Sequence, residues 1–198
     1  MRLKVAVLVL IFTLSYLPLP NAEAQVGAAA VNLKCVSVDA SGTVQIEVYP
    51  GATLTGQAIC TVSNPNSYQE KIEIDVQSED LVSAAPGSIT LGPNAEEDFY
   101  VTVRGEEGMA KSSRSLVVKA TVTEAMGFPP PNVAEEESSL IVSIMQYSGL
   151  QVESVDPLIT LKTKVDHNVE FRVYNQGNGA DRFTIGLTKE SIDNLENE

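Results

Sequence analysis

Apolar and polar residues alternate along several short segments of this chain, and this alternation predicts β-strands. In residues 71–77 every second side chain is apolar, and the side chains between them are charged or carry an amide. A period of two is typical of a strand that has one buried face and one solvated face. The same pattern, or a shorter apolar run, predicts further strands near residues 31–38, 43–49, 57–63, 88–91, 99–104, 116–123 and 140–144.

Turn-forming residues separate these predicted strands, and no segment has a convincing helical period. The turns contain Pro-Gly, Asn-Pro or closely spaced glycines, which favour the backbone angles of tight turns. They lie at residues 49–51, 64–66, 86–87, 92–94 and 105–108. About eight short strands in roughly 100 residues are typical of two sheets packed face to face. We therefore predict an all-β, Ig-like antiparallel β-sandwich over residues 25–148.

An internal repeat predicts a second module of the same kind. Residues 58–76 and 169–187 match without a gap, 111 positions apart, and each copy contains a strand, an Asn-led turn and a strand. The turns begin at Asn64 and Asn175. The first module continues for roughly 70 residues after its copy, whereas only residues 188–198 follow the second copy. We expect residues 149–198 to be the N-terminal part of a second, truncated Ig-like sandwich, and we hypothesise that the natural protein is longer.

The first 24 residues have the features of a secretory signal peptide. Arg2 and Lys4 precede an apolar run over residues 5–19, and Ala22-Glu23-Ala24 follows as a cleavage site. The run is shorter than the ~20 residues that span a bilayer. We expect cleavage before Gln25, although an uncleaved signal anchor remains an alternative. The predicted location is extracellular, either secreted or at the cell surface.

The net charge of −13 limits the classes of partner. Nucleic acid and anionic membranes both repel such a surface, and the basic residues form no cluster that could offset the repulsion. No membrane insertion is expected apart from the signal peptide. The expected partner is an unknown protein or a component of the cell envelope.

Two cysteines in an exported chain predict a disulfide between Cys35 and Cys60, because the compartment outside the membrane is oxidising. Neither cysteine has a basic or metal-binding neighbour that would indicate a reactive thiol or a metal site. The bond is therefore expected to stabilise the fold.

Residues that could carry catalysis are scarce. His167 is the only histidine, and no Ser or Cys lies in a G-x-S-x-G motif. Neighbouring carboxylates, such as those of Glu79 and Asp80, lie next to turns, where charge is usually solvated. We predict no catalytic residues, no cofactor and no enzymatic activity.

Two segments are candidates for binding. The longest irregular segment, residues 125–137, contains Phe128, Pro129, Pro130 and Pro131 and is a possible binding loop, the alternative being an extended hairpin connection. Asn175, Asn178 and Asp181 offer oxygen ligands around two glycines and are possible calcium ligands. The alternative for this second segment is a hairpin turn with positive φ angles, because its spacing is not that of an EF-hand loop.

Residues 171–185 resemble the strand, N-x-G-N, strand signature of CARDB-type Ig-like domains and of the related NPCBM-associated Ig-like domains of secreted alpha-galactosidases. Residues 88–99 are similar to the x-I-x-L-x-P-G stretch of the same domains, with Asn94 where the family favours Gly. The resemblance implies surface stalks, adhesion proteins or accessory modules of secreted enzymes, and it carries over no catalytic residue.

These observations predict a non-catalytic secreted or cell-surface module that acts in adhesion, binding or domain spacing. The alternative is a set of accessory Ig-like domains of a secreted glycosidase or peptidase whose catalytic domain lies beyond residue 198. A third hypothesis is self-association through open strand edges of the truncated second module.

Overall fold

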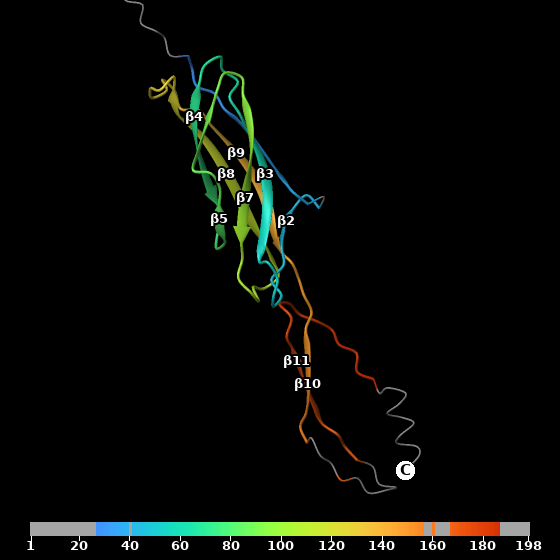
Figure 1. Ribbon diagram of the computed structural model, residues 1–198. Coiled ribbons are helices and arrows are strands. Elements are labelled where there is room, and N and C mark those ends of the chain that lie inside the picture. The colour runs from blue at the N-terminus through green and yellow to red at the C-terminus, as the bar shows by residue number, and fades with distance from the viewer. Residues whose placement is uncertain (1–26, 40, 157–159, 161–166, 187–198) are drawn as a thin grey trace, which may run out of the picture.

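The computed structural model describes residues 27–39, 41–156, 160 and 167–186, and every helix or strand assigned among them is a β-strand. Nine strands form a two-layered sandwich, and two more form a hairpin beyond one end of it (Figure 1). The predicted signal peptide, residues 1–24, and the last residues, 187–198, lie outside the described residues. In the part of the chain that is described, no helix is long and apolar enough to cross a membrane.

The two layers of the sandwich have four and five strands. The first sheet has the order β1-β3-β7-β5 and contains β1 (Asn32–Ser37), β3 (Thr55–Ser63), β7 (Glu96–Arg104) and β5 (Val82–Ala84). The second sheet has the order β2-β9-β8-β4-β6 and contains β2 (Val44–Ile46), β9 (Glu135–Ile144), β8 (Ser112–Ala125), β4 (Glu70–Gln77) and β6 (Ser88–Leu91). All pairs are antiparallel except β2 with β9. The predicted all-β, Ig-like sandwich is confirmed.

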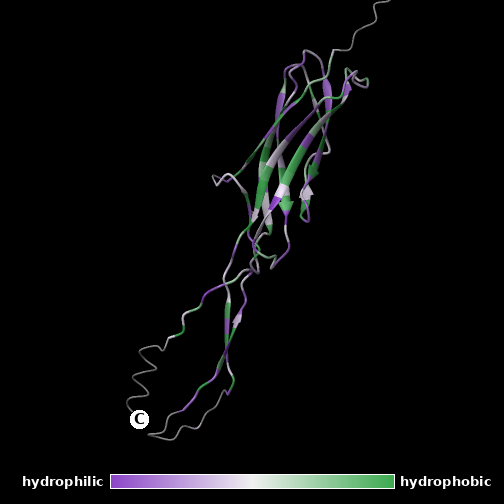
Figure 2. Ribbon diagram, turned by 180° about the vertical axis from the view of Figure 1, so that it is seen from behind, coloured by the Kyte–Doolittle hydropathy of each residue, from purple (hydrophilic) through white to green (hydrophobic). Residues whose placement is uncertain are grey.

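The core lies between the two sheets and consists of the apolar residues that the alternation assigned to one face of each strand. In β4 the side chains of Ile72 and Ile74 are buried, whereas those of Lys71, Glu73 and Asp75 between them are exposed. Apolar residues are seen along the strands in Figure 2. Burial of each large aliphatic side chain contributes about 1.5–3 kcal/mol. Large and fully buried members of the core are Ile46, Ile72, Leu116, Ile144, Val44, Val48, Val62, Val101, Val103, Val118 and Val142.

The strands differ from the predicted ones in length and in one addition. The pattern did not predict β5, because a three-residue strand with two exposed side chains has no readable period. Strands β8 and β9 start earlier than expected, and β8 also ends later. The antiparallel pairing runs from Ser112 opposite Ile144 to Thr121 opposite Glu135, so the polar start of each strand pairs with the predicted part of the other strand. Residues 43–49 form a shorter strand than expected, because only Val44–Ile46 pair with β9.

The residues predicted to begin a second module contain one antiparallel hairpin, β10 (Leu150–Ser154) with β11 (Phe171–Asn175). The expected strand after the second Asn-led turn is not formed in residues 182–186. Its counterpart β4 is held between β6 and β8, and the described part of the second module contains no equivalent neighbours. One face of the hairpin carries exposed apolar side chains, namely Leu150, Val152, Phe171 and Val173. The repeat counterparts of Phe171 and Val173 are Cys60 and Val62, which are buried in the core.

The two Asn-led turns have the same pair of side-chain hydrogen bonds, so the sequence repeat corresponds to a repeated local structure. The Oδ1 atom of Asn64 accepts from the Asn66 N–H at 2.9 Å, and its Nδ2 donates to the Tyr68 carbonyl at 2.7 Å. The Oδ1 atom of Asn175 accepts from the Gly177 N–H at 2.8 Å, and its Nδ2 donates to the Gly179 carbonyl at 2.7 Å. In both modules the amide therefore bonds residues two and four positions ahead, which fixes the turn that follows the strand.

Candidate functional site

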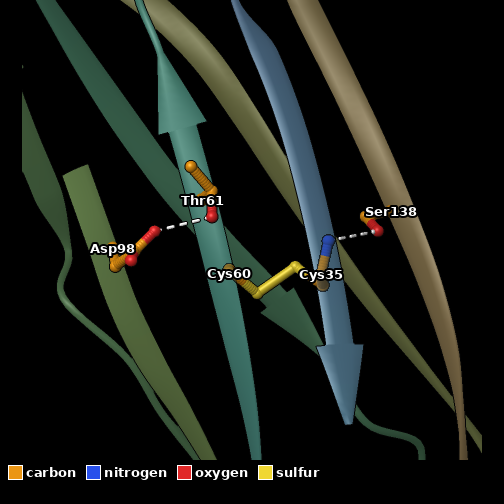
Figure 3. The surroundings of a disulfide bond; sticks show 5 residues. All are labelled: Cys35, Cys60, Thr61, Asp98 and Ser138. Atoms are coloured by element: carbon orange, nitrogen blue, oxygen red, sulfur yellow. Dashed lines mark hydrogen bonds between the residues drawn. A yellow bond between two sulfur atoms is a disulfide. The ribbon is translucent and has the colours of Figure 1, made fainter. Parts of the chain in front are cut away.

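The predicted disulfide between Cys35 and Cys60 is present and joins directly opposite residues of β1 and β3 (Figure 3). Both cysteines are buried, and no free cysteine occurs in the described ranges. The Cys35 N–H donates to the Ser138 Oγ at 3.0 Å, so β1 is also tied to β9 of the opposite sheet. The bond belongs to the packed interior and stabilises the first module.

The described residues contain no arrangement that suggests catalysis. No group of three or more His, Cys, Asp or Glu side chains among them could hold a metal ion. His167 lies on an exposed segment ahead of β11. Of the acidic pairs, Asp80 accepts two hydrogen bonds from the Arg114 guanidinium, at 2.7 and 3.3 Å. This contact lowers the pKa of the Asp80 carboxyl, whereas a general acid at neutral pH needs a raised pKa.

A shallow groove lies beside the end of β4 and encloses about 660 Å³. Its lining combines aliphatic and small polar side chains, namely Val76, Gln77, Ser78, Glu79, Leu81, Ser83, Ser115 and Val117. Glu79 contributes the one carboxylate of this lining, so the groove offers no pair of acids across a cleft of the kind that glycosidases use.

The predicted binding loop lies at the end of the sandwich away from the hairpin β10–β11 (Figure 1). We call this end the apex and call residues 126–134 the apex loop. The loop begins with a two-residue turn in which Met126 and Gly127 have φ angles of 53° and 81°. Two positive φ angles are typical of the type I′ turn that closes a hairpin. Ala125 and Phe128 flank the turn and exchange backbone hydrogen bonds of 2.8 and 3.0 Å.

The apex loop is held to its neighbours at both ends. The Met126 N–H donates to the Gln69 carbonyl at 2.9 Å. Asn132 Oδ1 accepts from the Ala29 N–H at 2.8 Å, and Asn132 Nδ2 donates to the Ala29 carbonyl at 3.0 Å. These bonds tie the loop to the segment that leads into β1. The loop is therefore ordered before any partner binds, which reduces the entropy cost of binding.

The apex loop exposes apolar side chains. The exposed fractions are 42% for Met126, 64% for Phe128 and 80% for Val133. Residues 125–134 carry no charge, although Glu124 and Glu135 flank them directly. Met126 and Val133 were missed by the sequence analysis, which singled out Phe128 and the prolines. The uncharged run between two glutamates was the signal that could have identified them.

The predicted calcium ligands come together in one loop after β11, but their oxygens already accept hydrogen bonds. Asn175 Oδ1 accepts from Gly177, and Asn178 Oδ1 accepts from the Tyr147 N–H at 2.9 Å. Asp181 Oδ1 accepts from side chains of the segment between β9 and β10, and only its Oδ2 lacks a partner in the described part of the chain. The hydrogen bonds explain this arrangement without an ion, and calcium binding stays a prediction.

Glu70 is a buried acidic residue that the sequence analysis missed. Its side chain is 1% exposed, and its Oε1 accepts from the Asn66 Nδ2 at 3.0 Å and from the Ala30 N–H at 3.3 Å. Glu70 stands 111 positions before Asp181, so the repeat could have identified it. In both modules an acid after the Asn-led turn accepts hydrogen bonds from the segment that leads into the first strand.

Comparison with known proteins leaves the family open. No family model matches the chain, and no curated protein matches it. Similar solved structures include the C-terminal part of native alpha-2-macroglobulin from Escherichia coli, at 13% identity and a TM-score of 0.44. The match covers 66% of this chain, but the chain spans only about a fifth (19%) of that structure.

Two further solved structures match this chain over most of their own length. A FixG-related protein from Vibrio parahaemolyticus is 13% identical, with 57% of this chain and 95% of that chain covered and a TM-score of 0.40. A PapD-like domain of human CEP192 is 10% identical, with 60% and 87% covered and a TM-score of 0.40. The likeness is one of fold. The strand order, with its parallel β2–β9 pair and its two facing sheets, is that of an Ig-like β-sandwich.

Proposed function

We propose that this chain is a non-catalytic, exported Ig-like protein that acts at the cell surface by adhesion, binding or domain spacing. The observation that carries the proposal is the apex loop, which exposes Met126, Phe128 and Val133 on a backbone fixed by hydrogen bonds. Exposed apolar residues on an ordered loop are typical of a contact surface for a partner. The partner is a protein or another component of the cell envelope.

Two observations support export. The Cys35–Cys60 disulfide is of a kind that forms and persists in oxidising compartments. The first 24 residues have the composition of a signal peptide. The resemblance of residues 88–99 and 171–185 to CARDB-type domains supports a place at the cell surface.

The second candidate is an accessory role in a secreted glycosidase or peptidase whose catalytic domain lies beyond residue 198. The exposed apolar face of β10–β11 supports this candidate and a longer stalk to the same degree. In both cases, further strands would cover that face. A downstream block rich in Trp, His and paired carboxylates would support the enzyme, and further repeats would support the stalk.

The test compares binding of the mature chain, residues 25–198, to isolated cell envelopes of the source organism. The double variant Phe128→Ser with Val133→Ser is expected to bind at least about tenfold more weakly, because burial of one large apolar side chain contributes about 2 kcal/mol. Val82→Ser is the matched control, since Val82 is 71% exposed but lies on β5, outside the apex loop. Equal binding by the loop variant and the wild type would contradict the proposal.

A further inference from the structure

The loop that follows β11 contacts the first module at the end opposite the apex, and the contact centres on one side chain. We call residues 175–181 the docking loop and call this end of the sandwich the base. Asn178 Nδ2 donates to the Met109 carbonyl at 2.9 Å and to the Met145 carbonyl at 2.8 Å. The Asn178 carbonyl accepts from the Lys111 N–H at 3.2 Å. With the bonds between Asn178 and Tyr147, one residue of the second module thus bonds four positions of the first.

The surface that receives Asn178 is ordered by the first module itself. The loop between β7 and β8 is fixed by hydrogen bonds from Gly105 N to the Leu54 carbonyl at 3.0 Å and from Gly108 N to the Val48 carbonyl at 2.9 Å. The Met109 side chain packs against the core of the sandwich. The two acceptor carbonyls therefore stand at fixed positions on a surface formed without the docking loop.

Glycines on both sides of Asn178 allow the close approach. A Cβ atom on Gly177 would lie 2.6 Å from the Tyr147 carbonyl oxygen, which no real side chain tolerates. A Cβ on Gly179 would lie 3.1 Å from the Gln146 side chain. The N-x-G-N-G sequence therefore serves a purpose beyond a hairpin turn, because a turn alone requires no contact with the first module.

Side chains around Asn178 extend the contact. Lys111 Nζ donates to Gln146 Oε1 at 3.1 Å, and Gln146 Nε2 donates to Asp181 Oδ1 at 3.1 Å. Ser148 Oγ donates to the same oxygen of Asp181 at 3.1 Å. The sequence analysis named Asn178 and Asp181 as possible calcium ligands, with a hairpin turn as the alternative. In the structure they connect the second module to the base of the first and to the segment between the modules.

We propose that the base of the first sandwich is a docking surface for the docking loop of a following Ig-like module, and that Asn178 is the residue that determines this fit. Docking holds consecutive modules end to end as one rigid body. The proposal deepens the spacing role and rests on it, since a fixed joint converts two modules into a spacer of defined length.

The same loop in the first module lacks the residues for docking. At an offset of 111 positions, Ser67 stands in place of Asn178 and Tyr68 in place of Gly179. Tyr68 instead donates its hydroxyl hydrogen to the Ala28 carbonyl at 2.7 Å, within its own module. The Asn-led turn at the apex of one copy therefore cannot dock on the base of another copy. The base accepts only the docking loop of the following module.

Backbone ¹⁵N relaxation and hydrogen exchange on residues 25–198 test the proposal. In the wild type the amides of β3 and β8 and those of β11 share one rotational correlation time. In Asn178→Ala the hairpin tumbles independently, and the Lys111 amide exchanges at least about tenfold faster because its acceptor is no longer held in place. Asn178→Asp gives the same result, since a carboxylate cannot donate to the carbonyls of Met109 and Met145.

Gln176→Ala is the matched control, because Gln176 lies in the same loop but its side chain donates to Gln151 Oε1 of the hairpin, at 3.0 Å, and not to the first sandwich. Independent tumbling of the two modules in the wild type would overturn the proposal without any variant. Unchanged tumbling and exchange in both Asn178 variants would overturn the role of that residue. Envelope binding is measured separately with the apex-loop variant, so failure of the binding function and failure of the joint are distinguishable.

Discussion

Replacement of Asn64 by alanine tests how the Asn-led turn stabilises the first module. The Asn64 side chain is 1% exposed. It donates to the carbonyls of Tyr68 at 2.7 Å, Gly92 at 3.0 Å and Leu91 at 3.4 Å, and it accepts from the Asn66 N–H at 2.9 Å. One amide therefore connects the end of β3 to the turn before β4 and to the segment after β6.

The expected loss of stability follows from these bonds. Three of the four are 3.0 Å or shorter, and each contributes about 1 kcal/mol net to the free energy of unfolding. The sum is about 3 kcal/mol, and the carbonyls left buried without a donor can only add to it. With a urea dependence of about 2 kcal/mol per molar, the unfolding midpoint should fall by about 1.5 M.

The measurement is urea unfolding of residues 25–198, monitored by far-UV circular dichroism and by tyrosine fluorescence. Asn32→Ala is the matched control, since Asn32 is exposed on β1 and makes one side-chain bond of 3.3 Å to Ser63. The control should change stability by less than about 0.5 kcal/mol. A loss below about 1 kcal/mol in Asn64→Ala would refute the reasoning, because water would then be replacing the amide.

Three further predictions concern the disulfide, the surface ion pair and calcium. Reduction of Cys35–Cys60, which closes a loop of 25 residues, should lower the free energy of unfolding by about 3.5 kcal/mol, and an unchanged urea midpoint in reductant would contradict this. Because Arg114 lowers the pKa of Asp80 below its ordinary 3.8, the pair's contribution is present above that value and is lost as the pH falls through the lowered pKa. Arg114→Gln should abolish this part of the acid dependence of the melting temperature, salt should weaken it, and identical acid profiles at low salt would count against it. The calcium-site hypothesis is tested by the melting temperature in calcium and in EDTA: we expect no difference, because Asp181 Oδ1 already accepts from Gln146 and Ser148, and a calcium-dependent increase would support the site.

The sandwich could be predicted from the sequence because its strands follow one simple rule. In β4, as in β7, alternate residues are apolar and face the same core, so the period of two survives intact. The repeat also located both Asn-led turns, since Asn64 and Asn175 each bond residues within four positions. Local hydrogen bonding of this kind is encoded in a few consecutive residues.

The contacts that hold the modules together could not be predicted in the same way. Asn178 bonds Met109 and Met145, which are 69 and 33 positions away in the sequence. The alternation of apolar and polar residues carries no information about contacts between such distant positions. Glu70 precedes the strand predicted over residues 71–77 and was not singled out, yet its side chain is buried and accepts hydrogen bonds from Asn66 and Ala30. A polar side chain is buried where the tertiary structure supplies its partners, and that information is absent from the pattern.

The arrangement of the sandwich edges bears on aggregation. Three of the four outermost strands are short, since β2 and β5 have three residues each and β6 has four. In the fourth, β1, the Cys35 N–H already donates to the Ser138 hydroxyl of β9. Short or already bonded edges give a neighbouring chain little backbone to pair with. Any strand addition between copies is therefore expected at β10 or β11, and the first module should resist aggregation even at high local concentration.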